Sequence, residues 1–491
     1  MLVGDLYLGD VEGSEEFNSK ASIDNLYFMG VSTSDIENLM SGRKRYIHGY
    51  KGTGKTSLIK LLETRCKDEH ISYFSISYRK IREDAEVVHE FRERFRLFRD
   101  TFTEEEDRDT TTLTFWKWYL LSLIARQFLG EEPDDLIQST RQKFFRAIAS
   151  VLDMLVVIFD PNGNVIFGLK TDKALSTDEN ASISEAAQSI RRLAKKIHDR
   201  LDSKVIIFID ELELTRARST YDVDRTMIKN LVIATKHINE ISKNLHIVLA
   251  VRDEVVYDLR GDEINKLLDG FGVSLTWWTN TRVTLDHHLW RLMFKKIRFS
   301  MKINNDNPDI LTDAELWQRW FPFSFGNKES WKVFFELTWA RPRDFVRLLS
   351  LMRDQCRDAK CFSNLAYDLA LRSYSQSALS EISEEISTLF DDETMRKVQK
   401  IIQSLGVNFT PSQFIECERK VGISTPSIIL DEMYRVGFIG NHYREESFPR
   451  WLFFYRNNKI PDMNRPFEVH KALHYALGIK GRFSTSVYYS G

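Results

Sequence analysis

The segment Gly49-Tyr-Lys-Gly-Thr-Gly-Lys-Thr56 is the most informative motif in this chain. The preceding Arg45-Tyr-Ile-His48 is typical of a short strand, and the following Ser57-Leu-Ile-Lys-Leu-Leu-Glu63 is typical of a helix. The pattern G-x-x-x-x-G-K-[ST] therefore occurs in the strand–loop–helix setting that it requires. Its glycines allow consecutive backbone N–H groups to face a phosphate, and the helix adds its positive N-terminal end. We predict a phosphate-binding loop here, in preference to a glycine-rich turn that arose by chance.

Two side chains at the end of this motif have defined roles in its chemistry. The Lys55 ammonium reaches the β- and γ-phosphates of a nucleotide, and the Thr56 hydroxyl is a ligand of Mg²⁺. The sequence thus predicts ATP and Mg²⁺ as cofactors. We expect the nucleotide to contact the whole loop, which comprises Gly49, Tyr50, Lys51, Gly52, Thr53, Gly54, Lys55, Thr56 and Ser57.

A second strand, Val205-Ile-Ile-Phe-Ile209, ends in two acids, Asp210 and Glu211. Five apolar residues in a row are typical of a strand buried on both faces of a parallel sheet. Ligands bind at the carboxyl edge of such sheets. There Asp210 can hold the metal, and Glu211 can polarise an attacking water. The alternative, an ordinary buried strand followed by a solvated turn, is weaker once a phosphate-binding loop is present.

A third strand, His246–Val251, ends in Arg252. Between it and Asp210 lies an expected helix, Asp224–Ser242, and strand–helix–strand with buried strands is a parallel βαβ unit. Arg252 then lies at the same sheet edge as Asp210, where it can sense a γ-phosphate. A solvated surface arginine explains the residue equally well, and both interpretations stay open.

More chain separates the loop from Asp210 than one or two βα units of about 30 residues need. We therefore expect an insertion at about residues 80–180 of a first domain that spans residues 1–260. Its expected elements are a strand at Ser72–Tyr78, a charged stretch at Arg79–Asp109, a helix at Phe115–Ala125 and a hairpin at Val156–Phe167 that turns at Asn162-Gly163. The charged stretch is either a lid or, more simply, a solvated helix face.

Residues 261–385 are predicted to form a helical lid domain. The segment Glu263–Ala370 is rich in tryptophan, which indicates aromatic packing rather than a cofactor site. Within it Arg341-Pro-Arg343-Asp344 is typical of a helix start, with an early proline and an acid in the first turn. Arginines at a helix start oppose its dipole. We therefore expect Arg341 and Arg343 to contact the phosphates of the nucleotide.

Residues 386–491 are predicted to form a winged-helix domain with a C-terminal tail. Three helices are expected within residues 391–434, followed by strands at Gly437–Asn441 and Arg450–Arg456. The third helix carries Asp431 and Glu432 and has Arg435 only at its end, whereas a helix that contacts DNA should be basic. A protein-contact or structural role is favoured over DNA binding.

Composition narrows the class of protein. The 491 residues include 22 glycines and 10 prolines, together about 6.5% of the chain. Average usage of the two is about 12%, so the composition favours helix. A net charge of −2 excludes a surface built entirely for nucleic acid. The four cysteines show no zinc spacing, and neither a signal peptide nor a membrane-spanning stretch is apparent. We expect a cytoplasmic protein with no membrane contact.

These motifs and others occur in a recognisable order. The others are Asp262-Glu-Ile-Asn-Lys266, Leu275-Thr-Trp277, Gly437-Phe-Ile-Gly-Asn441 and Phe467-Glu-Val-His-Lys-Ala-Leu473. Together, over about residues 20–480, they resemble the bacterial P-loop ATPases related to origin-recognition-complex-type AAA+ and STAND proteins, which are often found in antiphage defence operons. The resemblance implies an α/β P-loop NTPase, a parallel sheet with helices on both faces, followed by a helical lid and a winged helix.

The resemblance also implies roles for residues and partners. Lys55, Glu211 and Arg252 would be catalytic, Thr56 and Asp210 would bind the metal, and Arg341 or Arg343 would act as a second sensor. An arginine at position 252 departs from the polar sensor usual in AAA+ proteins, and Arg216 and Arg218 are candidates for an arginine finger.

The implied function is a switch or sensor ATPase, with slow turnover, that self-assembles and controls a separately encoded effector, a nuclease or toxin. A DNA-binding or DNA-loading ATPase, with the winged helix as reader, is the alternative. A scaffold that only retains nucleotide is a third possibility.

Overall fold

The computed structural model describes most of the chain outside the expected insertion. The described residues are 1–11, 31–78, 112–113, 116–117, 120–121, 123–125, 127–130, 156–159, 165–168, 179–212, 221–259, 262–278, 284–307, 309–325, 328–387, 390–421, 426–444, 449–456 and 460–479. The chain divides into two compact units. The sheet unit comprises residues 31–49 and 58–274, and the lid unit comprises residues 1–30, 50–57 and 275–491.

The sheet unit is built on a five-stranded sheet with the order β2-β5-β6-β1-β7. All four strand pairs are parallel, as the sequence predicted. The strands are β1 (Tyr46–Gly49), β2 (Ser72–Ser77), β5 (Val205–Leu212), β6 (Leu245–Arg252) and β7 (Gly272–Ser274). The longest apolar runs are β5 and β6, two interior strands of the sheet, as expected for parallel strands covered on both faces.

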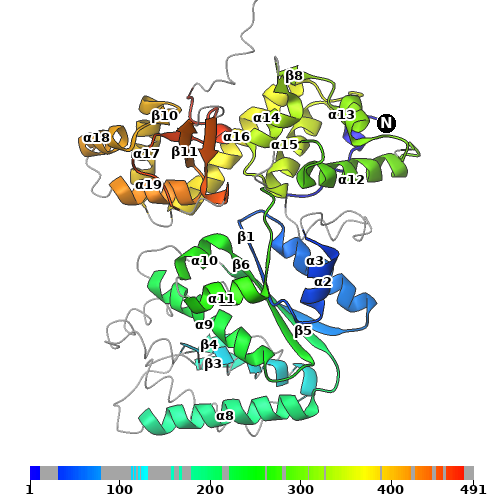
Figure 1. The fold of residues 1–491 in the computed structure, drawn as a ribbon, viewed down its shortest axis with the longest axis vertical. Coiled ribbons are helices and arrows are strands. Elements are labelled where there is room, and N and C mark those ends of the chain that lie inside the picture. Colours follow the sequence, from blue (N-terminus) through cyan, green and yellow to red (C-terminus); the bar gives the residue numbers. More distant parts are fainter. Residues whose placement is uncertain are drawn as a thin grey trace, which may run out of the picture. The chain divides into compact units, whose positions relative to one another are not determined.

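Helices flank this sheet on two sides (Figure 1), with α2 and α3 on one side and α9, α10 and α11 on the other. Among the described residues, the helices of the sheet unit include α2 (Thr33–Met40), α3 (Lys55–Asp68, whose first three residues belong to the lid unit), α8 (Glu179–Arg200), α9 (Tyr221–Asn239), α10 (Asp253–Leu259) and α11 (Asp262–Phe271). Helix α9 is the helix expected at Asp224–Ser242, and it completes the predicted βαβ unit.

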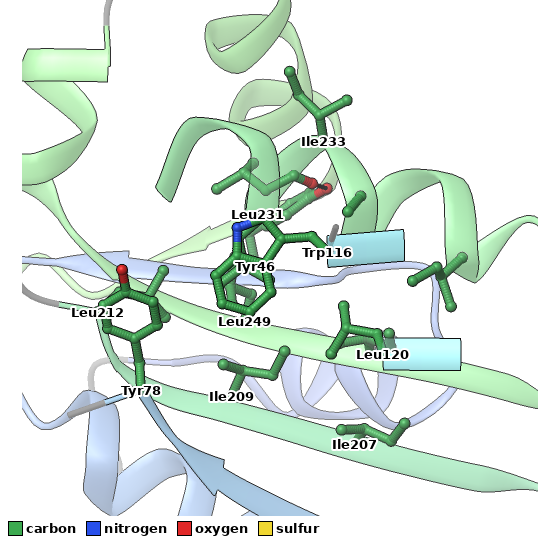
Figure 2. Packing of buried hydrophobic residues seen from close by; sticks show 14 of the residues in the cluster. Tyr46, Tyr78, Trp116, Leu120, Ile207, Ile209, Leu212, Leu231, Ile233 and Leu249 are labelled. Atoms are coloured by element: carbon green, nitrogen blue, oxygen red, sulfur yellow. Dashed lines mark hydrogen bonds between the residues drawn. The ribbon is translucent and has the colours of Figure 1, made fainter. Parts of the chain in front are cut away.

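One apolar cluster holds these layers together (Figure 2). Trp116 and Leu120, from the helix expected at Phe115–Ala125, pack in the same cluster as Ile207 and Leu249 of the sheet. The Trp116 indole N–H donates to the carbonyl of Met227 at 2.9 Å. A fully buried leucine or isoleucine contributes roughly 1.5–3 kcal/mol, so burial of these side chains favours packing of the helix against the sheet.

The expected hairpin is present in the insertion. Strands β3 (Val156–Phe159) and β4 (Val165–Gly168) pair antiparallel, with Phe159 opposite Val165. The predicted Asn162-Gly163 turn and the charged stretch 79–109 lie outside the described residues.

The lid unit contains the predicted aromatic helices. They are α12 (His288–Ile303), α13 (Asp313–Trp320), α14 (Ser330–Leu337), α15 (Pro342–Gln355) and α16 (Asn364–Ser387), with the short hairpin β8 (Ser324–Phe325) and β9 (Lys328–Glu329). Trp290 contacts Trp317 and Phe345 edge-on, with ring centroids 4.8 Å apart in each pair. The tryptophans therefore form core, as expected.

The C-terminal part of the lid unit has three helices and an antiparallel sheet, whose first strand, Asn408–Phe409, lies between the first and second helices in the sequence. The helices are α17 (Asp392–Leu405), α18 (Pro411–Val421) and α19 (Pro426–Arg435), and the strand order is β10-β13-β11-β12, from β10 (Asn408–Phe409), β11 (Ile439–Arg444), β12 (Pro449–Leu452) and β13 (Phe467–Val469). The strand predicted at Arg450–Arg456 is wrong in its second half. It ends at Leu452, and Phe454–Arg456 form the 3₁₀ turn η3. A second 3₁₀ turn, η4, covers Lys471–Leu473.

The first residues of the chain belong to the helical part of the lid unit. The 3₁₀ turn η1 (Val3–Asp5) donates from the Val3 N–H to the carbonyl of Ala359 at 2.8 Å. The Tyr7 N–H donates to the Ser300 hydroxyl at 2.7 Å, across 293 positions of sequence. Val3, Leu6 and Leu8 are fully buried. Among the described residues, no helix is both long and apolar enough for a membrane span.

Candidate nucleotide-binding site

The predicted phosphate-binding loop joins β1 to α3. Strand β1 ends at Gly49 and α3 begins at Lys55, two residues before Ser57, where the sequence predicted the helix to begin. Gly52 and Gly54 have φ angles of +80° and +97°. L-residues with side chains rarely adopt this left-handed region, so the backbone requires glycine at the motif position Gly54 and also at Gly52, which the motif leaves open.

The loop is closed by hydrogen bonds to one of its own carbonyls. The Lys55 ammonium and the Thr53 hydroxyl each donate to the Tyr50 carbonyl at 2.8 Å. These bonds hold the Lys55 cation against the loop backbone. A cation held there is placed to pair with an anion, if the loop N–H groups bind a phosphate as the motif predicts.

Two residues outside the loop, Trp277 and Phe454, hold it by hydrogen bonds within the lid unit. The Trp277 indole N–H donates to the Thr53 carbonyl at 2.9 Å, and the Tyr50 hydroxyl donates to the Phe454 carbonyl at 2.8 Å. The Tyr50 and Phe454 rings also meet edge-on at 5.8 Å. The sequence placed Tyr50 in the loop and Trp277 in a family motif, but neither partner was predicted.

Arg341 and Arg343, the two arginines expected near the nucleotide, both lie against the loop but in different settings. Arg341 donates from Nη1 to the Lys51 carbonyl at 3.1 Å and uses its Nε and Nη2 on the Asp344 carboxylate. Burial lowers the pKa of the Arg341 guanidinium, but the Asp344 carboxylate outweighs it and raises that pKa above its ordinary value. Arg341 therefore positions the loop through its backbone.

Arg343 stands closer to the glycine turn. Its N–H faces the Gly52 carbonyl at 3.5 Å, and a Cβ built on Gly52 would lie 3.2 Å from the Arg343 Cβ. Its guanidinium is 3.5 Å from the Glu381 carboxylate of α16, so its long side chain is held by a partner that can be exchanged for another anion.

Glu381 and Glu385 of α16 were not predicted, although both reach the loop. The Lys51 ammonium lies 2.7 Å from Glu385 and 3.6 Å from Glu381, and Arg347 lies 2.8 Å from Glu381. Burial raises the pKa of Glu381, but the surrounding cations, led by Arg341 and Lys51, bring it well below its usual range. Glu381 is thus an anion held among cations.

The two acids Asp210 and Glu211 lie in the sheet unit. Asp210 is in register with Ser77, and the ladder between β5 and β6 is irregular between Ile209 and Leu212. At this irregularity Glu211 has a φ of +62°, which is uncommon for a residue with a side chain. Its N–H donates to the Asp210 carboxylate at 2.7 Å, and the Ser77 hydroxyl donates to its carboxylate. Strained backbone angles and irregular strand ladders occur often at functional sites, where they set the direction of a side chain.

Arg252 ends β6 in register with Gly49, the first residue of the loop motif. The next residue, Asp253, lies 2.8 Å from the ring of His48. The carboxyl ends of β1, β5 and β6 thus carry Gly49, the two acids and Arg252, as parallel topology requires. The remaining site residues, from Tyr50 to Ser57 with Arg341 and Arg343, belong to the lid unit. Arg216 and Arg218 lie outside the described residues.

Comparison with known proteins gives one family match and one curated relative. Residues 287–383, which run from the start of α12 through α13, α14 and α15 to most of α16, match the family model of the FunZ-associated C-terminal helical domain. Over 495 aligned residues the chain is 22% identical to the "Putative transposon gamma-delta 80.3 kDa protein" of Escherichia coli strain K12. The match covers 93% of this chain and 64% of that relative, so the chain spans less than two thirds of the relative's length.

Similar solved structures include three archaeal proteins. They are a Walker-type ATPase of Pyrococcus abyssi (13% identity, TM-score 0.37, 86% of this chain and 93% of that chain), Cdc6p of Pyrobaculum aerophilum (10%, 0.32, 94% and 95%) and ORC2 of Aeropyrum pernix in its ADP form (12%, 0.32, 90% and 88%).

Proposed function

We propose that this chain is a P-loop ATPase that binds Mg²⁺·ATP and hydrolyses it slowly. The observation that carries the proposal is the loop after β1. Two left-handed glycines, a helix that begins at the motif lysine and a parallel sheet with acids at a strand end occur together in one chain. A glycine-rich turn without a phosphate role needs none of the other features.

The residues present suit the proposed cofactors. Mg²⁺ prefers oxygen ligands and commonly takes one or two carboxylates with substrate phosphates and water. The sequence motifs offer one oxygen ligand of each kind, the Thr56 hydroxyl and the Asp210 carboxylate, and we propose these two as the protein ligands. Among the described residues no group of three or more His, Cys, Asp or Glu forms a denser metal site. Bound Mg²⁺ would neutralise charge on the phosphates, while Lys55 pairs with their oxygens.

Glu211 is the proposed general base. A carboxylate that accepts a hydrogen bond from Ser77 and is turned by an unusual backbone angle can take a proton from water in one defined direction. Arg252, at the end of the neighbouring strand, is proposed to respond to the γ-phosphate. Arg343 is favoured over Arg341 as the lid arginine that contacts nucleotide, because Arg341 is committed to Asp344 and the loop backbone.

We further propose that nucleotide binding switches self-assembly and the control of a separately encoded effector, in bacterial antiphage defence. The resemblance of the sequence motifs supports this setting. A second subunit would supply the cation that closes over the γ-phosphate.

DNA binding is the second candidate, because the curated relative is named as a transposon protein. The C-terminal helices, which we propose to be a winged helix, argue against it. Arg435 ends α19 with 9% of its side chain exposed and lies 3.3 Å from Glu432. A gel shift with duplex DNA at several salt concentrations separates the candidates, since a steep salt slope would favour DNA binding.

Three variants test the ATPase proposal. We expect Lys55→Ala to lose ATP binding, measured by calorimetry, and Glu211→Gln to bind ATP without hydrolysing it, because an amide accepts no proton. Lys67→Ala removes an exposed lysine of the same helix and should leave both properties unchanged. Wild-type hydrolysis by Glu211→Gln would exclude Glu211 as the base. Tight nucleotide retention without turnover in the wild type would instead indicate a scaffold.

A further inference from the structure

A charge cluster joins the loop to α16. We define it as four cations, Lys51, Arg341, Arg343 and Arg347, and three carboxylates, Asp344, Glu381 and Glu385. Within it Glu381 lies 2.8 Å from Arg347, 3.5 Å from Arg343 and 3.6 Å from Lys51. The Glu381 carboxylate therefore interacts with three cations. One of them, Lys51, is a loop residue, and another, Arg343, packs against the loop glycine Gly52.

The cluster is sheltered enough for these charges to matter. The side chains of Glu381, Arg347, Lys51 and Arg343 are 13%, 18%, 19% and 27% exposed. Exposed pairs contribute about 0–1 kcal/mol, but removing one partner from a buried pair costs more because the other charge stays desolvated. The cations exceed the carboxylates by one. The cluster as defined therefore carries a net positive charge, which favours the approach of an added anion.

A nucleotide phosphate is such an anion, and it uses the same donors as Glu381. Carboxylate and phosphate oxygens both accept from the guanidinium fork and from lysine. Arg343 and Lys51 lie beside the loop glycines, where the proposed function puts the phosphates. An anion on the loop and the Glu381 carboxylate therefore compete for the same two cations.

We propose that Glu381 is a positioning residue that holds Arg343 and Lys51 and yields them to nucleotide phosphate, so that phosphate binding loosens the hold of the loop on α16. This rests on the proposed function, since it needs nucleotide at the loop. Linkage makes the effect reciprocal. The free energy by which bound nucleotide weakens the contact between the loop and α16 equals the free energy by which that contact weakens nucleotide binding.

Calorimetric titration of the full chain with ATP, ADP and AMP tests the proposal. Glu381→Gln keeps the shape of the side chain and removes its charge. We expect it to bind ATP about tenfold more tightly than the wild type, within the usual range of coupling, and to show a smaller gain for AMP. Glu393→Gln removes an acid that pairs with Lys397 on α17 and is the matched control, with no expected gain.

A second variant ties the gain to the arginine. In the Arg343→Ala background, Glu381→Gln should give much less gain in ATP affinity, because the competing donor is gone. Equal gains in both backgrounds, or weaker ATP binding by Glu381→Gln, would overturn the proposal. Absence of ATP binding by the wild type would instead defeat the proposed function.

Hydrogen exchange gives a readout that does not depend on the variants. In the wild type, saturating ATP should speed amide exchange around Glu381 in α16, while the loop becomes slower. Exchange in α16 that slows together with the loop would show that nucleotide tightens this contact and would also overturn the proposal.

Discussion

The carboxylate of Asp344 accepts both ends of the Arg341 guanidinium, at 2.7 Å from Nε and 2.9 Å from Nη2. It also accepts the Trp339 N–H at 3.1 Å and is itself only 1% exposed. The same Arg341 donates to the Lys51 carbonyl. Asp344 is therefore connected to the loop at residues 49–57 through one intervening side chain, that of Arg341.

Removing this carboxylate should destabilise the protein. We expect Asp344→Ala to lower the free energy of unfolding by about 3–5 kcal/mol, because it leaves the Arg341 charge desolvated and unpaired. Urea denaturation measures the change. Glu416→Ala breaks the exposed pair with Lys420 and should cost less than about 1 kcal/mol. Equal losses of unfolding free energy in the two variants would show that the buried contact with Arg341 stabilises the protein no more than an exposed ion pair does.

The backbone at Glu211 predicts an inverted order of two substitutions. At φ +62° alanine is strained and glycine is not, so Glu211→Gly should be more stable than Glu211→Ala by about 1 kcal/mol. Both variants lack the carboxylate, so the pair isolates the backbone. At Lys397, inside α17, the alanine variant should be the more stable of the two by about 1 kcal/mol. The same order at both sites would contradict the strained geometry.

Two glycines of similar conformation separate strain from crowding. Gly52 and Gly406 have φ angles of +80° and +83°, but a Cβ would meet Arg343 at Gly52 and open space at Gly406. We expect both alanine variants to lose about 1 kcal/mol of stability. Only Gly52→Ala should also weaken ATP binding, measured by calorimetry. If Gly406→Ala weakened binding equally, the loop would not be the binding site.

Nucleotide should change the assembly state. We expect a non-hydrolysable ATP analogue with Mg²⁺ to increase the mass of the protein, measured by light scattering after size-exclusion chromatography. Lys55→Ala should block the increase and Lys67→Ala should retain it. An unchanged monomer mass at micromolar protein would favour a monomeric switch that acts on another chain.

Glu418 makes stability depend on pH. It is fully buried in α18, and neither carboxylate oxygen has a hydrogen-bond partner among the described residues. Burial raises its pKa to about 7. Because the folded pKa lies above the unfolded value of about 4.3, the charged form opposes folding. This group's contribution is therefore most favourable below pH 4 and is lost as the pH rises to 7.

Substitution isolates that contribution from the rest of the protein. The loss between pH 4 and pH 8 is on the order of 3 kcal/mol for a shift of this size. We expect Glu418→Gln to gain stability over the wild type as the pH rises, measured by urea denaturation at each pH. A difference between the two proteins that stays constant with pH would show that Glu418 titrates normally.

The sequence predicted those parts of the fold that are encoded locally. The loop motif, the apolar strands β5 and β6 and the proline-started helix α15 each carry their signal within about ten residues. The pairing of Lys51 with Glu381 and Glu385 has no such signal, because α16 lies more than 300 positions downstream of the loop. Asp344 was assigned to the helix dipole, whereas the structure shows it as the partner of Arg341. Strands β10 and β13 were missed because they are only two and three residues long.

The N-terminal segment sets an order of events during synthesis. Tyr7 and its partner Ser300 are 293 positions apart, and residues 31–49 and 58–274 of the sheet unit are made between them. At 5–20 residues per second, a translating ribosome takes roughly 15–60 s to cover that interval. During this time the residues of the lid unit that follow position 275 have not been made, so they cannot yet bury the apolar side chains of Leu6 and Leu8. The nascent chain therefore keeps these two leucines unburied until the part of the lid unit after residue 275 has been made.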